Sequence, residues 1–234
     1  MRIALVAEDY YPQLGGVPEH VHHLALELAA RGHQPTIVTA KMRNVQADPP
    51  HVRRVGTSLV IYANGGVARI TTGWRLGDQL ARVFRETGTE LVHVHGGLSP
   101  VLGLAAPTVA ERLGLPVMAT FHTWFPRSVG YAVFRRPLQA RLDRLAATVA
   151  VSGAAIEAMS RYFRAPWEII PNGIDVTAFH PGRRRRPPQP GAPLRLLFLG
   201  RLEPRNGLDT ILEAMPAIAA RWIGTQSGHH APSL

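Results

Sequence analysis

The sequence has 234 residues, of which 46% are hydrophobic and 18% charged, with a formal net charge of +10 and no cysteine. This composition is typical of a globular protein and excludes a collagen-like or disordered chain, and without cysteine neither disulfides nor thiolate metal sites are possible. No apolar run approaches the roughly 18 residues of a membrane-spanning helix, and acidic residues follow the start too soon for a signal-peptide core, so we expect a cytoplasmic protein.

Arginine supplies nearly all of the basic excess, since Lys41 is the single lysine. A positive chain suits nucleic acid, anionic lipid or phosphorylated small molecules. The sequence contains none of the recognisable nucleic-acid-binding modules. We therefore expect a partner that carries phosphate, and no nucleic acid.

Short runs rich in Val, Ile and Leu alternate with stretches of helical periodicity. The expected strands are residues 2–7, 34–40, 58–63, 90–95, 116–121, 147–152 and 167–171. The expected helices are residues 17–31, 73–86, 99–114, 137–146 and 153–163. Nearly continuous apolar strands separated by helices predict a parallel sheet covered on both faces, an α/β fold of the doubly wound type.

The pattern changes after residue 181. The segment PGRRRRPPQPGAP has the composition of a linker, LRLLFLG predicts a strand, and the following helix carries an apolar stripe at Leu208, Ile211, Leu212 and Met215. One strand–helix unit of this size cannot bury its own faces. We expect a domain at 1–181, a linker at 182–193, the first unit of an incomplete second domain at 194–220, and an atypical tail at 221–234.

Gly15 and Gly16 stand between the first strand and the first helix. A helix N-terminus presents unpaired N–H groups and a partial positive charge that receive anions, and glycines let a ligand approach the backbone. In open α/β sheets such ligands lie at the carboxyl ends of the strands. A plain tight turn explains the pair equally well. The dinucleotide fingerprint G-x-G-x-x-G is not satisfied, which argues against a nicotinamide enzyme.

Six motifs follow one another along the chain: LGGVPEHVHHLALELAARGHQPTIVTA, VHVHGGLSP, ATFHT, VAVSGAAIEAM, IIPNGIDVTAFHP and LFLGRLEPRNGLDTILEAMP. In this succession the sequence resembles the family 4 glycosyltransferases, retaining enzymes of the GT-B architecture with two Rossmann-like domains. FHT, NGGVAR and PNGIDV are most similar to the phosphatidylinositol mannosyltransferase branch. The resemblance implies that residues 1–181 form the Rossmann-like acceptor-side domain, and that a donor-side domain begins after the linker and is truncated.

The resemblance assigns roles to residues of the first domain. Gly15 and Gly16 would lie against phosphate groups in the cleft, with His20 one turn into the helix. A surface histidine satisfied by a neighbour is the alternative for His20. His122 of FHT follows the carboxyl end of a strand, and the family's matching histidine contacts the transferred sugar, so His122 is the candidate catalytic residue. Its alternative is a loop histidine that caps the strand.

Further acceptor-side residues follow from the same resemblance. Thr123 and Arg127 belong to the loop that touches the acceptor head group in the mannosyltransferase branch, where Lys stands at the position of Arg127. Arg69 of NGGVAR matches an acceptor-side arginine, with a solvated edge residue as the alternative. Asn172 begins the turn NGID, a cleft-facing loop in the family that turn chemistry alone also explains.

On the donor side, Arg201 matches the arginine that holds the donor diphosphate, because a guanidinium bonds phosphate oxygens bidentately. Arg205 is a second candidate, beside Asn206 where the family carries Lys. His93 and His95 share one strand face, but no third ligand is evident, so no metal site is expected. No cofactor is expected either, since a nucleotide-sugar such as GDP-mannose or a UDP-sugar would be a substrate.

The resemblance implies transfer of a hexosyl unit, such as mannosyl, from a nucleotide-sugar to a phosphorylated lipid or saccharide acceptor. Three interpretations stay open: an active enzyme completed by another chain, a truncated acceptor-side domain, and a non-catalytic module that docks on anionic membrane. The family's paired carboxylates, E-x7-E, are not reached in this sequence. We therefore expect the chain to be inactive or impaired.

A basic surface suggests peripheral contact with the inner face of the plasma membrane. Residues 122–164 contain seven arginines against Asp143 and Glu157, a local charge of +5. Arg75, Arg82 and Arg85 are expected on one face of the helix at 73–86. Most basic helix faces are merely solvated. We therefore expect membrane docking to assist the enzyme and not to be a function by itself.

Overall fold

The computed structural model describes residues 1–42, 45, 47–63, 66–99, 101–179, 195–200, 202 and 204–226, with backbone alone at 62, 63, 66–68, 205 and 223–226. The chain divides into two units, Met1–Ile61 with Ala68–Gly173 and Tyr62–Val67 with Ile174–Leu234. The expected linker, residues 182–193, lies outside the described residues. The domain boundary at residue 181 therefore stays a prediction.

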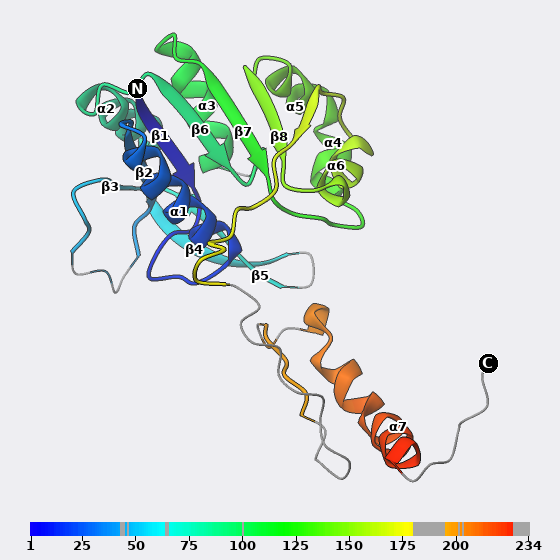
Figure 1. The fold of residues 1–234 in the computed structure, drawn as a ribbon. Helices are drawn as coiled ribbons and strands as arrows, with labels where there is room; N and C mark the ends of the chain where they lie inside the picture. Colours follow the sequence, from blue (N-terminus) through cyan, green and yellow to red (C-terminus); the bar gives the residue numbers. More distant parts are fainter. Residues whose placement is uncertain are drawn as a thin grey trace. The chain divides into compact units, whose positions relative to one another are not determined.

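A seven-stranded parallel sheet forms the centre of the first unit, in the order β3-β2-β1-β6-β7-β8-β9 (Figure 1). Its strands are β1 (Arg2–Ala7), β2 (Gln34–Ala40), β3 (Val52–Val55), β6 (Leu91–His95), β7 (Val117–Phe121), β8 (Ala147–Ala150) and β9 (Trp167–Ile169). Strands β4 (Thr57–Ala63) and β5 (Gly66–Thr72) pair with each other as a separate two-stranded sheet. The parallel α/β fold predicted from the sequence is confirmed.

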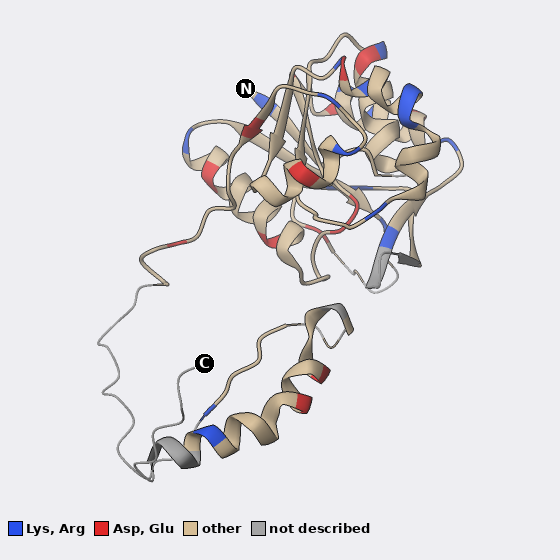
Figure 2. Ribbon diagram, turned by 90° about the vertical axis from the view of Figure 1, so that its right-hand side faces the viewer, with Lys and Arg blue, Asp and Glu red and all other residues tan. Residues whose placement is uncertain are grey.

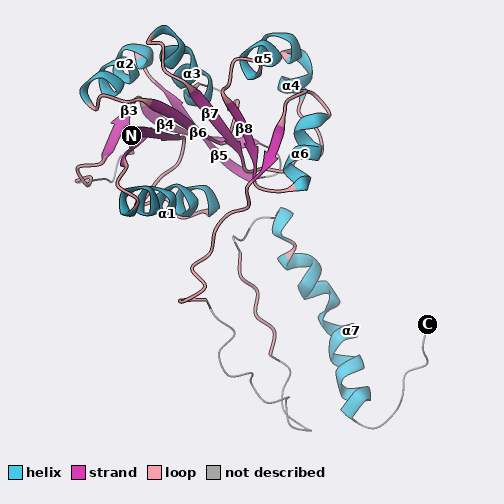
Figure 3. Ribbon diagram, turned by 45° about the horizontal axis from the view of Figure 1, so that its top comes forward, coloured by secondary structure: helices cyan, strands magenta, loops and turns pink. Residues whose placement is uncertain are grey.

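Helices cover both faces of the sheet. They are α1 (Gly16–Ala30), α2 (Leu76–Glu86), α3 (Leu102–Arg112), α4 (Val129–Val133), α5 (Arg135–Leu142) and α6 (Gly153–Ser160). Figure 3 shows α1 on one side of the sheet and α2 and α3 on the other. The helix expected at 137–146 is α5, which begins and ends earlier than predicted, and the short helix α4 before it was not predicted.

The two cores explain why β1 is apolar from Ile3 to its end. Successive side chains of a strand point to opposite faces. In β1, Ile3 and Leu5 join the core beneath α1, whereas Ala4 and Val6 join the core that α2 and α3 cover. Burial on both faces leaves no polar positions in such a strand, which is why this strand shows no polar–apolar alternation.

The strand order reverses at β1, whose neighbours are β2 on one side and β6 on the other. In a doubly wound sheet the ligand crevice lies at this switch point, outside the carboxyl ends of the strands. Ala7 at the end of β1 pairs with His95 at the end of β6, and His95 pairs with Thr120 near the end of β7. The loops that follow β1, β6 and β7 therefore leave the sheet side by side.

Two strands were missed in the sequence, and β3 shows the reason. Its sequence, VRRV, has two arginines and does not form an apolar run. Arg54 is nevertheless buried, with its Nε 2.8 Å from Oδ2 of Asp48, and its guanidinium donates to the carbonyl oxygens of Ala40 and Tyr11. A charge paired in this way can be buried at the edge of a sheet.

After Ile174, the described residues form a single turn of 3-10 helix, Pro204–Asn206, and the helix α7 (Leu208–Gln226). The strand expected at 194–200 is not formed over residues 195–200. A strand needs a paired neighbour to be stable, and within the described part of the chain residues 195–200 pair with no strand. The apolar stripe of α7 is exposed, with Leu212 at 58%.

Helix α7 continues to Gln226, into the segment expected as a tail, and residues 227–234 lie outside the described residues. Across the part of the chain that the structure describes, each helix is either too short or too polar to cross a bilayer.

Candidate functional site

Three histidine side chains from different elements meet at the carboxyl edge of the sheet. His20 lies one turn into α1, His95 ends β6, and His122 follows β7 directly. The ring centroid of His20 lies 5.4 Å from that of His95 and 5.0 Å from that of His122, and those two lie 5.5 Å apart. The structure thus brings the predicted His20 and His122 together with a histidine to which the sequence assigned no role.

The hydrogen bonds of these histidines leave two ring nitrogens unused. Nδ1 of His95 lies 3.3 Å from Nε2 of His122, so one of them donates to the other. Nε2 of His95 and Nδ1 of His122 are buried, and neither has a hydrogen-bond partner among the described residues. His93 points to the same strand face, as predicted, with its ring centroid 4.0 Å from that of His95 and its Nε2 2.8 Å from the Thr120 hydroxyl. Buried polar atoms are normally paired, so the two unused nitrogens indicate a place for a ligand.

Burial keeps the cluster uncharged at neutral pH. Desolvation lowers the pKa of His122 to about 4 and that of His93 to about 3, and nearby histidines add to both shifts. Desolvation also lowers the pKa of His20 and places the pKa of His95 well below its usual range. A neutral imidazole offers one N–H donor and one lone pair, so each ring is able both to donate and to accept a hydrogen bond.

The first turn of α1, which precedes His20, has no side-chain cap. Gly15 is in extended backbone conformation. A Cβ atom added at Gly16 would meet nothing within 4 Å, so neither packing nor backbone strain requires glycine there. Because Pro18 has no N–H, the first turn presents the N–H groups of Gly16 and Val17. Such a helix end attracts anions, phosphate above all.

Arg69 lies against the loop that follows β1. Its Nη2 donates to Oε1 of Gln13 over 3.1 Å, and its Nε lies 3.7 Å from Oδ1 of Asp9. The side chain is 23% exposed. These contacts argue against a fully solvated arginine, while its role toward an acceptor stays a prediction.

Glu8 is a half-buried acid at this edge that was not predicted from the sequence. One carboxylate oxygen accepts from the backbone N–H of Leu102 over 3.1 Å and from the Ser99 hydroxyl over 3.3 Å, and the other accepts from the Thr71 hydroxyl. Burial raises its pKa, although these bonds act in the opposite direction. Glu8 therefore ties β5 and the first turn of α3 to the end of β1. An acid directly after an apolar strand was the available signal.

The remaining predicted acceptor-side residues are exposed. Thr123 and Arg127 lie in the loop after β7. Arg127 lines an open hollow of about 550 Å³ together with Trp124, Pro126, Arg161 and Tyr162. The guanidinium carbon of Arg161 lies 5.9 Å from the ring centroid of Trp124, within cation–π range. This hollow suits a flat or anionic group.

Asn172 is exposed beyond the end of β9, and no hydrogen bond or ring contact within the described part of the chain joins it to the three histidines. Arg201 lies outside the described residues, and Arg205 is described by its backbone alone. The roles of these three residues stay predictions.

Three arginines of the predicted basic surface form ion pairs. Arg141 and Arg144 both contact Glu111, with N···O distances of 3.0 and 3.2 Å, and Arg161 pairs with Glu157. Figure 2, which turns the side of α4–α6 toward the viewer, shows acidic segments among the basic ones. Of the two acids in these pairs, Glu157 is already included in the local charge of +5, so Glu111, which lies outside residues 122–164, is the one that lowers the expected charge further.

The arginines of α2 differ from the expectation as well. Arg75 is not on the helix face with Arg82 and Arg85: it precedes the helix in left-handed conformation, and its Nε lies 2.6 Å from Oδ2 of Asp78. The helix begins at Leu76, three residues later than expected. Arg82 and Arg85 are exposed.

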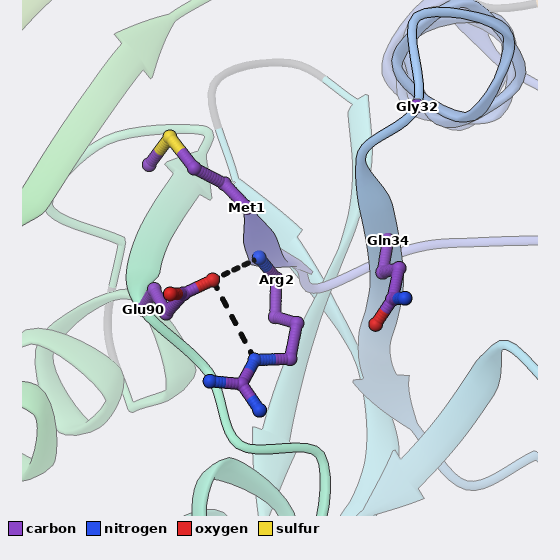
Figure 4. Close-up of a pocket in the computed structure, with 5 residues that line it drawn as sticks. All are labelled: Met1, Arg2, Gly32, Gln34 and Glu90. Atoms are coloured by element: carbon purple, nitrogen blue, oxygen red, sulfur yellow. Dashed lines mark hydrogen bonds and ion pairs between the residues drawn. The ribbon is translucent and has the colours of Figure 1, made fainter.

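A second hollow, of about 290 Å³, lies at the opposite edge of the sheet and is lined by Met1, Arg2, Gly32, Gln34 and Glu90 (Figure 4). An oxygen of Glu90 accepts from the backbone N–H of Arg2 over 2.6 Å and lies 3.5 Å from Nε of Arg2. The charged groups here satisfy each other. Because open α/β sheets bind ligands at the carboxyl edge, we assign no site to this hollow.

Comparisons with known proteins agree with the family resemblance found in the sequence. Residues 14–178 match the sequence profile of Glycosyltransferase Family 4. The chain is 31% identical over 226 residues to phosphatidyl-myo-inositol mannosyltransferase of Mycolicibacterium smegmatis, which covers 95% of this chain and 56% of that protein. It is 28% identical over 256 residues to a glycogen synthase of Mycobacterium tuberculosis, which covers 96% of this chain and 60% of the relative.

Among solved structures, the chain is similar to Acinetobacter baumannii MurG, with a TM-score of 0.45 and 12% identity over 73% of this chain and 44% of that one. The chain spans little more than half the length of the mannosyltransferase it matches. The predicted similarity to the phosphatidylinositol mannosyltransferases is confirmed. With more than half of its residues matched by the family profile, the chain belongs to glycosyltransferase family 4.

Proposed function

We propose that this chain is the acceptor-side part of a retaining hexosyltransferase. It would take part in transferring a hexosyl unit, such as mannosyl, from GDP-mannose or a UDP-sugar to a phosphorylated lipid or saccharide. The observation that carries the proposal is the meeting of the uncapped first turn of α1 with His122 at the carboxyl edge of the sheet. The name of the mycobacterial relative favours mannosyl as the sugar and a phosphoinositide lipid as the acceptor.

The chemistry of the residues at this edge supports a division of labour. The N–H groups of Gly16 and Val17 would bind phosphate oxygens, because they are oriented donors at the positive end of a helix. His122 is neutral at pH 7, so it would act on the sugar through hydrogen bonds and not as a fixed cation. Its hydrogen bond to His95 fixes the orientation of the ring. His95 is thus a positioning residue in this proposal.

The 234-residue chain alone is proposed to transfer sugar poorly. Donor binding is assigned to Arg201, Arg205 and a donor-side E-x7-E carboxylate pair that residues 194–234 do not contain. Removing one preorganised hydrogen-bond donor from the site of a group-transfer enzyme slows the reaction by about 10²–10³-fold. Several such deficits together would reduce turnover to background.

The test combines binding and turnover. Glycerophosphoinositol binding is measured by calorimetry for the unmodified chain, for Gly16→Asp and for His23→Ala, a control on the exposed side of α1. We expect Gly16→Asp to weaken binding at least tenfold, about 1.4 kcal/mol, because it places a carboxylate where the phosphate would lie. Equal affinity of the two variants would refute the acceptor site.

Turnover is measured with radiolabelled GDP-mannose and UDP-glucose in the presence of phosphatidylinositol. We expect no multiple turnover. Robust turnover that His122→Ala abolishes would refute the proposed impairment while supporting the role of His122, so the two parts of the proposal fail separately.

We also propose that the chain contacts the inner face of the plasma membrane peripherally. Membrane binding without catalysis is the alternative function. Helix α4 and the residue after it expose Val129, Val133 and Phe134 at 80%, 68% and 58%. Arg127 and Arg136 are exposed before and after this apolar segment. Apolar side chains flanked by cations suit insertion at an anionic surface.

Sedimentation with vesicles tests this membrane contact. Binding to phosphatidylinositol-containing vesicles should fall as salt rises, because charge attraction is screened over about 8–10 Å at ordinary ionic strength. Val133→Asp should reduce binding further, whereas Leu26→Asp, at another exposed apolar position, should not. Equal binding to vesicles of neutral lipid would exclude the basic surface as the cause.

A further inference from the structure

The three histidines at the carboxyl edge have a geometry that glycosyl transfer does not require. One ring nitrogen from each of His20, His95 and His122 lies within 4.8 Å of the corresponding nitrogen of the other two. The three residues come from a helix, a strand end and a loop, so folding alone brings them together. We propose that His20, His95 and His122 form a binding site for a single transition-metal ion such as Zn²⁺.

The distances are close to those of a zinc site. Two nitrogens bound to one tetrahedral zinc at 2.0–2.1 Å lie roughly 3.4 Å apart. Nδ1 of His95 and Nε2 of His122 already lie 3.3 Å apart. The other separations, within 4.8 Å, would have to close through movement of the His20 ring, which is half-buried one turn into α1. An ion would replace the hydrogen bond between His95 and His122 with two coordinate bonds.

The donor set selects the kind of ion. Three imidazole nitrogens suit Zn²⁺, Co²⁺, Ni²⁺ and Cu²⁺, whereas Mg²⁺ and Ca²⁺ prefer oxygen ligands. Imidazole ligates in its neutral form, the form in which burial keeps these rings. With three protein ligands, a fourth position stays available to water or another ligand.

The neighbouring His93 shows what a satisfied core histidine looks like in the same strand. Its Nε2 is hydrogen-bonded to Thr120, and it is not part of the triad. His95 is 2% exposed, and its Nε2 has no partner among the described residues, as also holds for Nδ1 of His122. These are the other nitrogens of the two rings, because the ion would bind Nδ1 of His95 and Nε2 of His122. The positions of the three rings, and not these unpaired atoms, support the metal site.

Visible absorption of Co²⁺ tests the proposal on the chelator-treated chain. All proteins carry His229→Asn and His230→Asn, because two adjacent histidines in the sequence would otherwise compete for the ion. We expect one Co²⁺ per chain with the intense visible bands of four- or five-coordinate Co²⁺, displaced by equimolar Zn²⁺. His20→Ala and His122→Ala should each weaken Co²⁺ binding at least about tenfold. Loss of even a residue that hydrogen-bonds a metal ligand lowers metal affinity by about 10–100-fold.

His23→Ala is the matched control, because His23 lies on α1 near His20 but pairs with Glu19 in solvent. It should bind Co²⁺ as tightly as the unmodified chain. Binding that survives both His20→Ala and His122→Ala, or the absence of the visible bands, would overturn the proposal.

A measurement on the unsubstituted histidines covers the case in which a variant fails to fold. In ¹⁵N imidazole spectra, one equivalent of Zn²⁺ should shift the ring signals of His20, His95 and His122 together and leave His33 and His51 in place. Shifts confined to other histidines would overturn the proposal. Neither experiment contains sugar or acceptor, so the outcome is independent of the proposed transferase function.

Discussion

The two edges of the parallel sheet differ in how their polar groups are satisfied. At the amino edge, Glu90 and Arg2 pair with each other across a small hollow. At the carboxyl edge, His95 and His122 keep buried nitrogens without partners among the described residues, and α1 has no side-chain cap. Buried polar atoms without partners, and not a hollow in the surface, therefore favour the carboxyl edge as the proposed ligand site.

The largest expected difference between the edges concerns glycine. Gly97, after β6, has φ +68°, and an added Cβ atom would lie 2.2 Å from Cε1 of the buried Phe121. Gly88, at the amino edge, has φ +58°, but its Cβ would meet the end of the flexible Arg2 side chain. We expect Gly97→Ala to lower the free energy of unfolding by about 3 kcal/mol or more, and Gly88→Ala by about 1–2 kcal/mol. Urea unfolding measures both changes. Equal losses of stability would contradict the expectation that the buried Phe121 ring cannot move aside for the added Cβ atom.

The second difference concerns pH. The pKa values of His93 and His122 lie near 3 and 4 in the folded chain, below the unfolded value of about 6.5. Between those limits the unfolded chain binds protons that the folded chain does not. The free energy of unfolding should therefore fall as pH decreases from about 6.5 toward 4, by up to about 1.4 kcal/mol per pH unit for each histidine.

Urea unfolding at pH 7.5, 6.5, 5.5 and 4.5 measures this slope. His93→Gln should flatten it, because it removes one group that must stay neutral. Glu90→Gln should leave the slope above pH 5 unchanged, because the pKa of Glu90 is lowered and its contribution is lost only as pH falls through that lowered value. An identical slope in His93→Gln would contradict the neutral histidine cluster.

A smaller effect is expected at Gly16. Because an added side chain meets nothing within 4 Å, Gly16→Asp should fold normally. Its carboxylate at the start of α1 should raise the free energy of unfolding by about 0.3–1 kcal/mol through the helix dipole. Thermal unfolding measures this change. A loss of stability above about 1 kcal/mol would show that Gly16 serves packing and not ligand approach.

The smallest effect is expected for Glu90→Gln at the amino edge. Its ion pair with Arg2 is exposed on both sides, and such pairs contribute little to stability. The urea midpoint at pH 7 and the affinity for glycerophosphoinositol should both stay within experimental error. A clear decrease in affinity would place the ligand at the amino edge, opposite to the proposed site.

Local sequence patterns predicted the elements of the main sheet more accurately than the others. The bounds of β1 and β2 were predicted to the residue. In β1 the reason is burial on both faces, which gives a continuous apolar pattern from Ile3 onward. β3 carries Arg53 and Arg54, and its charge is compensated by Asp48, which no local pattern reveals. The strand expected at 194–200 is not formed over residues 195–200, although the sequence there is an apolar run. Its backbone N–H and C=O groups have no neighbouring strand to bond with.

The histidine cluster shows the limit of prediction from spacing. The sequence places His93 and His95 on one strand face, which the structure confirms, but offers no third ligand nearby. His20 and His122 reach His95 only because α1 and the loop after β7 meet at the same edge. That contact depends on the strand order, which the alternation of strands and helices does not fix by itself.

The most direct test of a ligand site at the carboxyl edge is amide chemical-shift mapping with glycerophosphoinositol on the ¹⁵N-labelled chain. We expect the largest changes at Gly15, Gly16, Val17 and His122, and none at the amino edge. Changes centred on Arg2, Gly32 and Glu90, or spread evenly over the exposed arginines, would contradict a ligand site at the carboxyl edge of the sheet.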